Sequence, residues 1–161
     1  ELSLAREQGT LQRNLQGYST HADCDLIGLG VSSIGKVGDS YSQSVKELSQ
    51  YYARLDQGLL PVHRGYRLSE DDRLRREVIS DLMCHGRIEF SKFETRYGID
   101  FNEYFAEALA QLREHVRDEL LEIHPDRLLL LPAGYLMMRS VAMAFDAYLG
   151  GEQKGNFSRT V

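Results

Sequence analysis

The fold is decided by the apolar stretch Asp25-Leu-Ile-Gly-Leu-Gly-Val-Ser-Ser-Ile34. Its branched aliphatic residues and closely spaced glycines predict a buried strand that runs into a Gly-rich turn. A strand this apolar needs neighbours on both faces, as the strands of a parallel barrel have. The rest of the chain offers few candidate neighbours. This mismatch indicates that a larger partner region is missing from the chain.

The bulk composition is that of an ordinary globular protein. The chain has 161 residues, of which 42% are hydrophobic and 27% charged, with a formal net charge of −5. This acidic balance argues against a nucleic-acid binder, and the apolar runs are too short to span a bilayer. Because the sequence opens on Glu1 without Met, signal or transit segment, we expect a truncated or processed chain. Two cysteines, Cys24 and Cys84, are too few for a disulfide framework and favour a reducing, cytoplasmic setting.

Helical signals follow the apolar stretch. Ser44 and Glu47 form a capping-box pattern that predicts a helix ending at Gly58, followed by a linker-like stretch over 59–65. We expect residues 41–63 to be a connecting helix and linker.

Residues 64–150 have the element order of a winged-helix-like domain. A helix is predicted from Ser69, with Asp72 in its capping box, and should bury Leu74, Val78, Leu82 and Ile79. A short strand over 87–90 and a helix capped by Ser91 and Glu94 and ending at Gly98 come next. The helix opened by Asp100 and Glu103 has one apolar face, made of Phe101, Phe105, Ala108, Leu109, Leu112 and Val116.

A predicted hairpin over 120–131, the wing, and a last helix after Pro132 complete this domain. The last helix should turn Met137, Val141, Ala144, Phe145 and Tyr148 inward. Residues 151–161 are expected to be a tail. The predicted fold class is mostly α with a small amount of β, with a C-terminal winged-helix-like domain.

The motifs for common cofactors are weak. The spacing of Gly28, Gly30 and Gly35 does not fit the dinucleotide-binding fingerprint, and tight packing at a strand end explains these glycines. Glycine can also let a backbone approach a ligand closely. His21, Asp23 and Cys24 cluster in a short loop, but without the spacing of a metal site, so we predict no metal ligands and no catalytic residue. Cys84 is expected to be a small apolar residue of a helix.

DNA binding by the winged-helix-like unit is disfavoured by charge. The helix expected in the recognition position carries five acidic residues against Arg113 and Arg117. Such a helix would repel phosphates, which favours a packing or lid module. An autonomous winged-helix regulatory module stays open as an alternative.

Two phrases resemble a known family. The phrase Gln12-Arg-Asn-Leu-Gln-Gly-Tyr-Ser-Thr20, followed by the apolar stretch 25–34, resembles a signature of the oxygen-independent coproporphyrinogen III oxidases, which are radical S-adenosylmethionine enzymes. Collinear similarities continue at Lys46-Glu-Leu-Ser-Gln-Tyr-Tyr52, Arg75-Arg-Glu-Val-Ile79, Asp100-Phe-Asn-Glu-Tyr-Phe-Ala-Glu107 and Phe157-Ser-Arg159. The resemblance thus covers essentially the whole chain.

The resemblance implies a reaction and its cofactors. Members bind a [4Fe–4S] cluster through a CxxxCxxC motif and hold two S-adenosylmethionine molecules in a partial barrel. A 5′-deoxyadenosyl radical takes hydrogen from propionate side chains, and oxidative decarboxylation of two propionates of coproporphyrinogen III to vinyls gives protoporphyrinogen IX in haem biosynthesis. The cysteine motif is absent here, so the fragment itself is expected to be inactive and to bind no cofactor. The resemblance also implies that residues 1–40 are the C-terminal remnant of the partial (β/α) barrel, that the N-terminal barrel is the missing partner, and that the parent enzyme is monomeric.

Two cofactor-binding residues carry over from the resemblance. Gln16 matches a family glutamine near the second S-adenosylmethionine, and Ile34 matches an isoleucine that lines the site of the radical-generating one. Both could instead be packed barrel residues. Ser33 replaces the usual Ala of the family phrase, and Gln12 replaces a common His. The related haem chaperones of the same superfamily are the alternative family, but they tend to read HNxxYW where this chain has Gln16-Gly-Tyr-Ser-Thr20.

Overall fold

The computed structural model describes residues 1–14, 17–21 and 24–149. The chain is a mixed helix and sheet protein that divides into two compact units, residues 1–74 and 75–161. The division falls inside one long helix, α3 (Glu70–His85). None of the helices within the described ranges is both long and apolar enough to cross a membrane.

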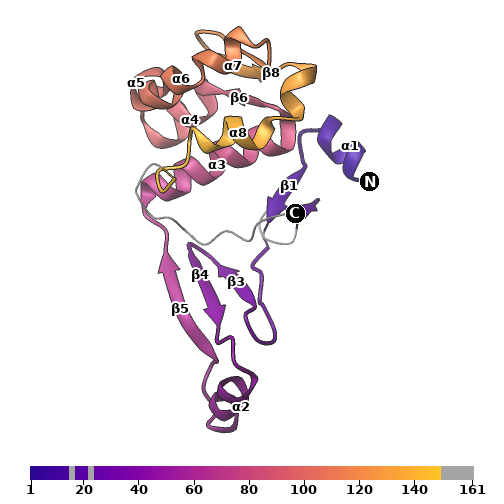
Figure 1. Ribbon diagram of the computed structural model, residues 1–161, viewed down its shortest axis with the longest axis vertical. Coiled ribbons are helices and arrows are strands. Elements are labelled where there is room, and N and C mark those ends of the chain that lie inside the picture. Colours follow the sequence, from indigo (N-terminus) through magenta and orange to yellow (C-terminus); the bar gives the residue numbers. More distant parts are fainter. Residues whose placement is uncertain (15–16, 22–23, 150–161) are drawn as a thin grey trace. The chain divides into compact units, whose positions relative to one another are not determined.

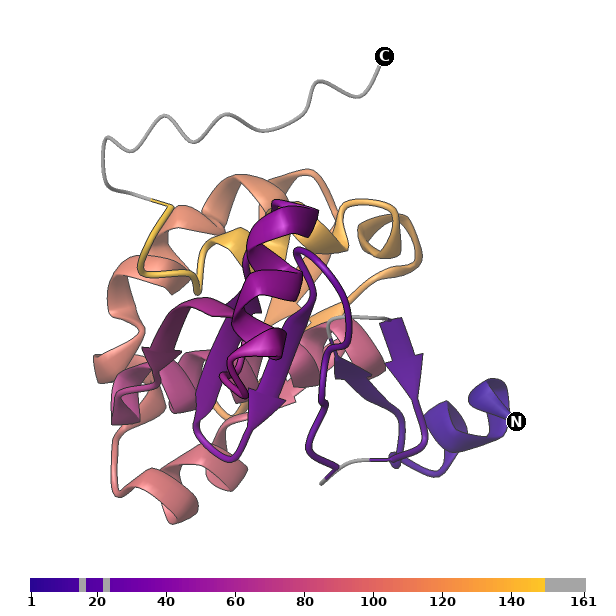
Figure 2. The ribbon, with the colours of Figure 1, turned by 90° about the horizontal axis from the view of Figure 1, so that it is seen from below.

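The first unit contains two small antiparallel sheets (Figure 1). Its elements are α1 (Leu2–Glu7), β1 (Gln12–Asn14), β2 (Gly17–Ser19), β3 (Ile34–Val37), β4 (Ser40–Ser44), α2 (Leu48–Asp56) and β5 (Val62–Arg67). Strands β1 and β2 pair with each other, whereas the second sheet has the order β3-β4-β5. Helix α2 lies at the end of that sheet where β4 ends and β5 begins (Figures 1 and 2).

Local signals explain the β3–β4 hairpin. Ile34 pairs with Gln43 and Val37 with Ser40, so the chain reverses at Gly38, whose φ is +53°. Glycine adopts this left-handed conformation without steric cost. The turn is also fixed because the Gly38 N–H donates to Oδ1 of Asp25 at 2.8 Å. The expected linker over 59–65 is different in the structure, since its second half belongs to β5.

The predicted capping box at Ser44 and Glu47 is wrong. Ser44 is the last residue of β4 and is buried, and helix α2 begins later, after Glu47, whose side chain makes no capping hydrogen bond. Pairing of β4 with β5 outweighs the local preference of Ser44 for a helix start, because it satisfies backbone groups on both strands. The predicted end at Gly58 is confirmed, with φ of +70° and its N–H donating to the Leu55 carbonyl at 2.8 Å.

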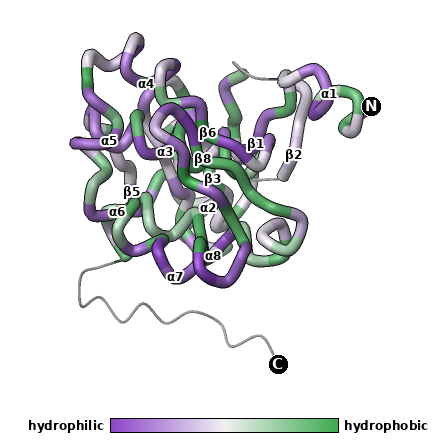
Figure 3. Tube along the Cα trace, turned by 90° about the horizontal axis from the view of Figure 1, so that it is seen from above, coloured by the Kyte–Doolittle hydropathy of each residue, from purple (hydrophilic) through white to green (hydrophobic). Residues whose placement is uncertain are grey.

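The prediction of a buried strand over residues 25–34 is wrong for the described chain. Leu26 forms an isolated bridge with Lys36 and Ile34 begins β3, while Ile27 is 75% and Leu29 is 85% exposed. Figure 3 shows the hydrophobic character of this stretch, which leads into β3. The small antiparallel sheet covers too little area to bury it, so apolar side chains suited to an interior face solvent.

The second unit combines short helices with a three-stranded sheet. After α3 come β6 (Arg87–Glu89), α4 (Phe90–Tyr97), α5 (Phe101–Tyr104), α6 (Ala106–Gln111), α7 (Arg113–Arg117), β7 (Leu121–Ile123), β8 (Arg127–Leu130), a 3-10 turn η1 (Pro132–Tyr135) and α8 (Met138–Met143). The sheet has the antiparallel order β6-β8-β7.

Helix α3 begins as its sequence predicts. The Asp72 N–H donates to Oγ of Ser69 at 3.1 Å, and the Ser69 N–H donates to Oδ2 of Asp72 at 2.8 Å, which is the predicted capping box. Leu74, Val78 and Leu82 are buried as predicted, whereas Ile79 is half-buried.

The predicted strand at 87–90 and the predicted hairpin are confirmed. Leu121 pairs with Leu130 and Ile123 with Leu128, and the His124 N–H donates to the Arg127 carbonyl at 2.8 Å to close the turn. The capping box at Ser91 and Glu94 is wrong, because the N-cap residue of α4 is Glu89 and the helix begins at Phe90. The Glu94 carboxylate instead accepts from the Phe101 N–H at 3.1 Å and so links α4 to α5.

The helical segment after Asp100 is interrupted near Phe105 and Leu112, where the sequence predicts one helix. Asp100 caps it as predicted, with the Glu103 N–H donating to Oδ1 at 2.9 Å. Phe101 is at the centre of the core: its ring stacks on Phe90 at 4.2 Å and lies 4.6 Å from Phe105. Such aromatic packing joins α4 and α5.

The last helical segment is shorter than predicted. Val141 and Phe145 are completely buried as expected, and Ala144 is half-buried. Met137 and Tyr148 are 47% and 65% exposed, so their predicted inward orientation is wrong. The 3-10 turn after Pro132 and the end of α8 at Met143 rotate both residues away from the apolar face.

Candidate functional site

Ile34 is the one predicted cofactor-binding residue that the structure describes. It is the first residue of β3, pairs with Gln43, and its side chain is 41% exposed. Gln16 lies outside the described residues. The candidate site is therefore built around Ile34 and the apolar stretch that precedes it.

Gly28 packs directly against the backbone of Ile34. A Cβ added to residue 28 would lie 2.7 Å from the Ile34 carbonyl oxygen and 2.9 Å from its carbonyl carbon. Only a residue without a side chain fits so close an approach. The glycine thus serves a packing requirement and also leaves the Ile34 backbone uncovered by any side chain from residue 28.

A second glycine sits one residue after Ile34. The Cβ of a larger residue at position 35 would lie 3.0 Å from the Leu26 carbonyl oxygen. Next to it, Leu26 and Lys36 exchange two backbone hydrogen bonds, each of 2.7 Å. The stretch before the turn is therefore held tightly against β3 at one point, although its side chains are exposed.

Serine hydroxyl groups fix the turn that joins the apolar stretch to β3. Oγ of Ser33 donates to the Gly30 carbonyl at 2.8 Å and lies 3.0 Å from Oγ of the buried Ser44. The Ser44 N–H in turn donates to the Ser33 carbonyl at 2.9 Å. The hydroxyl of Ser33, the departure from the family phrase, is thus accommodated by polar neighbours.

Tyr51 belongs to this site and was missed in the sequence. Its hydroxyl accepts the Gly30 N–H at 3.1 Å, across twenty-one positions of the chain. Gly30 has φ of +95°, so this turn needs glycine or strain. A tyrosine in an amphipathic helix carries no local signal for such a contact, so only the structure could identify it.

The surface of the site is apolar. Ile27, Leu29 and Val31 are at alternating positions and are all exposed, as is Ile34. Exposed backbone beside glycines and apolar side chains can bind a flat, partly apolar ligand such as an adenosine group. Asp25, which holds the Gly38 N–H, and Lys36 are the charged residues in this stretch, and neither forms an acid–base pair there. The arrangement suits binding and offers no catalytic pair.

The described parts of the chain contain no cluster of candidate metal ligands. No group of three or more His, Cys, Asp or Glu side chains there could hold a metal ion. Cys24 is exposed and Cys84 is buried in α3, consistent with the apolar role predicted for Cys84. Asp23 of the loop cluster lies outside the described residues.

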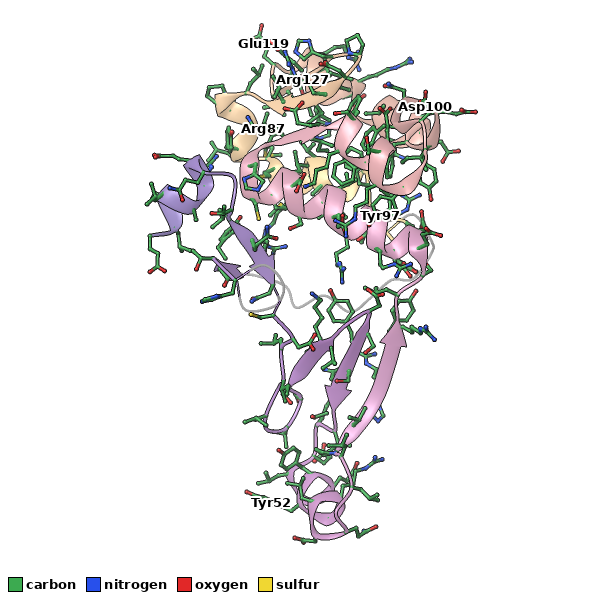
Figure 4. All side chains as sticks on the ribbon, turned by 180° about the vertical axis from the view of Figure 1, so that it is seen from behind. Tyr52, Arg87, Tyr97, Asp100, Glu119 and Arg127 are labelled. Carbon is green, nitrogen blue, oxygen red and sulfur yellow. The ribbon has the colours of Figure 1, made fainter. Side chains whose placement is uncertain are left out.

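The helical segment 101–117 of the second unit has an acidic surface. Glu103, Glu107 and Glu114 are exposed, and so are Asp118 and Glu119, which follow the segment. Arg117 is engaged by Glu114, with Nη2 and Oε1 3.3 Å apart. Figure 4 labels Glu119 at one end of this unit. Phosphate groups would meet net negative charge here.

Comparisons with known proteins identify relatives along the whole chain. Residues 68–137 match the family model described as the HemN C-terminal domain. The chain is 45% identical over 161 residues to an oxygen-independent coproporphyrinogen III oxidase of Pseudomonas aeruginosa, covering 100% of the chain and 35% of the relative. The corresponding protein of Escherichia coli K12 is 39% identical over 162 residues, again covering 100% of the chain and 35% of the relative.

A solved structure agrees with these sequence matches. It is that of coproporphyrinogen III oxidase (HemN) from Escherichia coli, described as a radical SAM enzyme. The two structures superpose with a TM-score of 0.89 at 40% sequence identity, over 92% of this chain and 34% of the other. The chain therefore spans about one third of the length of the relatives that it matches.

Proposed function

Because the chain belongs to the family of oxygen-independent coproporphyrinogen III oxidases, we propose that it is the C-terminal part of such an enzyme. The whole protein would convert coproporphyrinogen III to protoporphyrinogen IX in haem biosynthesis, by oxidative decarboxylation of two propionates to vinyls. The observation that carries the proposal is 45% identity over all 161 residues of the chain.

Within that enzyme, the contribution of this chain is to bind and orient. When bound, S-adenosylmethionine supplies the radical that removes hydrogen from a propionate side chain. Ile34 would contact the radical-generating molecule, and Gln16 would contact the second. The apolar, partly exposed Ile34 and the glycine-lined backbone beside it fit an adenosine group. A glutamine amide can both donate and accept hydrogen bonds at a polar ligand.

The [4Fe–4S] cluster does not fit this chain. The two cysteines of the chain, Cys24 and Cys84, lie sixty positions apart, and Cys84 is buried. A cluster needs three or four closely grouped thiolates. We propose that the cluster is ligated in the part of the relatives' length that this chain does not span, and that the chain alone is inactive.

The proposed domain organisation follows from the same reading. Residues 1–40 would complete a partial (β/α) barrel, and 41–63 would connect it to residues 64–150. The predicted tail, 151–161, lies outside the residues that the structure describes. Exposure of Ile27 and Leu29 supports the first part, because a barrel would supply the missing neighbours. The sheet order β6-β8-β7 and the helices before it support a winged-helix-like arrangement for the third part.

The surface charge and the composition of the chain support the remaining parts of the proposal, which concern its partners and its location. The acidic exposed surface after Asp100 supports a packing or lid role over nucleic-acid binding by an autonomous regulatory module. We keep the cytoplasmic location and the monomeric parent enzyme as parts of the proposal. The related haem chaperones are a weaker candidate, because the relatives described above carry the oxidase name.

An anaerobic assay of the full-length protein tests this function. Wild-type protein with a reconstituted cluster, S-adenosylmethionine and a reductant should form protoporphyrinogen IX from coproporphyrinogen III. Gln16→Ala should lower the rate while leaving cluster content unchanged. Stable haem binding without conversion of coproporphyrinogen would support the chaperone instead.

A further inference from the structure

We propose that Tyr51 of α2 is a positioning residue that, through Gly30, sets the turn that presents Ile34 to S-adenosylmethionine; this inference depends on the proposed function. The Tyr51 hydroxyl accepts the Gly30 N–H at 3.1 Å. The Gly30 carbonyl accepts from Oγ of Ser33 at 2.8 Å. Side chains therefore hold both backbone polar groups of the residue at the centre of the turn.

The turn requires this support because its backbone is unusual. Gly30 has φ of +95° and Ser32 has φ of +59°. A non-glycine residue in the left-handed region costs free energy unless neighbouring groups hold it there. The Ser32 N–H donates to the Val45 carbonyl at 2.9 Å, so the turn is fixed at both of its unusual residues.

The link to Ile34 is short and covalent. Ile34 follows Ser32 by two positions, and its backbone also packs on Gly28 with no space for a side chain. A change in the conformation of the Gly30 turn can therefore shift Ile34 relative to Gly28. Loss of the Tyr51 hydroxyl releases that peptide without emptying the space of the phenyl ring.

The adjacent Tyr52 provides a matched control. It lies in the same helix (Figure 4) and is 56% exposed. Its ring packs edge-on against that of Tyr51, with the two ring centroids 5.9 Å apart. No hydrogen bond of its hydroxyl is found among the residues that the structure describes. Tyr51→Phe and Tyr52→Phe thus each remove one tyrosine hydroxyl from neighbouring positions of α2. Only the hydroxyl of Tyr51 contacts the turn, through the Gly30 N–H.

The experiment measures S-adenosylmethionine binding to the full-length, cluster-loaded protein by equilibrium dialysis, together with amide hydrogen exchange of residues 28–34. Tyr51→Phe should raise the dissociation constant by about three- to tenfold, as the loss of one hydrogen bond predicts. It should also speed exchange at Gly30. Tyr52→Phe should match wild type in both readouts, and cluster content should be equal in all three proteins.

Ser33→Ala removes the second side-chain hydrogen bond to Gly30, the one to its carbonyl, and serves as a further variant in the test. If Tyr51 acts through this turn, the double variant should deviate from the sum of the single effects. Equal affinities for Tyr51→Phe and Tyr52→Phe, with wild type binding normally, would overturn the inference and leave the proposed function intact. Failure of wild type to bind S-adenosylmethionine would instead refute the proposed function.

Discussion

The backbone of Gly28 passes so close to Ile34 that a Cβ on residue 28 would lie 2.7 Å from the Ile34 carbonyl oxygen. Gly28→Ala should therefore displace the stretch before β3 and destabilise the protein by about 1–3 kcal/mol, the usual cost of overpacking. It should also weaken S-adenosylmethionine binding to the full-length protein. Denaturant titration and equilibrium dialysis measure the two effects.

Gly65→Ala is the control for that prediction. A Cβ at position 65 would meet the Tyr41 carbonyl oxygen at 3.4 Å, which is ordinary van der Waals contact. We expect its affinity to match wild type. If both variants behaved alike, the close approach of Gly28 to Ile34 would have no role in binding.

The capping box of α3 should contribute measurably to stability. Ser69→Ala should lower the free energy of unfolding by about 1–2 kcal/mol, because it leaves the Asp72 N–H without its acceptor. Asp72 is buried and also accepts from the Tyr66 hydroxyl at 2.8 Å, so its substitution should cost more. Glu70→Ala, which removes a charge from the same turn, should cost less than about 0.5 kcal/mol at moderate salt. A loss for Glu70→Ala as large as for Asp72→Ala would point to charge instead of capping.

The phenylalanine cluster should dominate the stability of the second unit. Phe101 is completely buried and stacks on Phe90 with an interplanar angle of 9°. Phe101→Ala should lower the free energy of unfolding by about 3–5 kcal/mol through lost contacts and a cavity. Leu136→Ala, at a position that is 89% exposed, should change it by less than about 0.5 kcal/mol. Thermal or denaturant unfolding measures both, and a small loss for Phe101→Ala would contradict the packing.

The 161-residue chain should not assemble an iron–sulfur cluster. Anaerobic reconstitution with iron and sulfide should give no stoichiometric cluster absorbance, because only two cysteines are present and Cys84 is buried. A stoichiometric cluster spectrum from the chain alone would contradict this prediction. Its loss in Cys24→Ser would then identify a ligand.

The sequence predicts elements well where local chemistry decides them. The Ser69 and Asp72 capping box, the end of α4 at Gly98 and the hairpin 121–130 depend on neighbours within a few residues. Ser44 was wrongly assigned to a helix start because its place in β4 depends on a strand more than fifteen residues away. Pairings of this kind leave no local periodicity.

The candidate site was predictable in part. Ile34 followed from the resemblance, and its prediction as a binding residue stays open to test. The exposure of Ile27 and Leu29 contradicts the burial predicted for them, because an apolar strand pattern indicates which neighbours a segment needs and not which neighbours a given chain provides. Tyr51 was not predictable, since its contact with Gly30 joins a helix to a turn far away in the sequence.

The central claim is that Ile34 presents an apolar contact to S-adenosylmethionine. It is tested most directly by S-adenosylmethionine affinity of the full-length, cluster-loaded protein with Ile34→Asp or Val37→Asp. Both residues are exposed and lie on β3, on opposite faces of the strand. We predict at least about tenfold weaker binding for Ile34→Asp, since a carboxylate would replace an apolar contact, and little change for Val37→Asp. Wild-type affinity in Ile34→Asp, with an intact cluster, would contradict the claim.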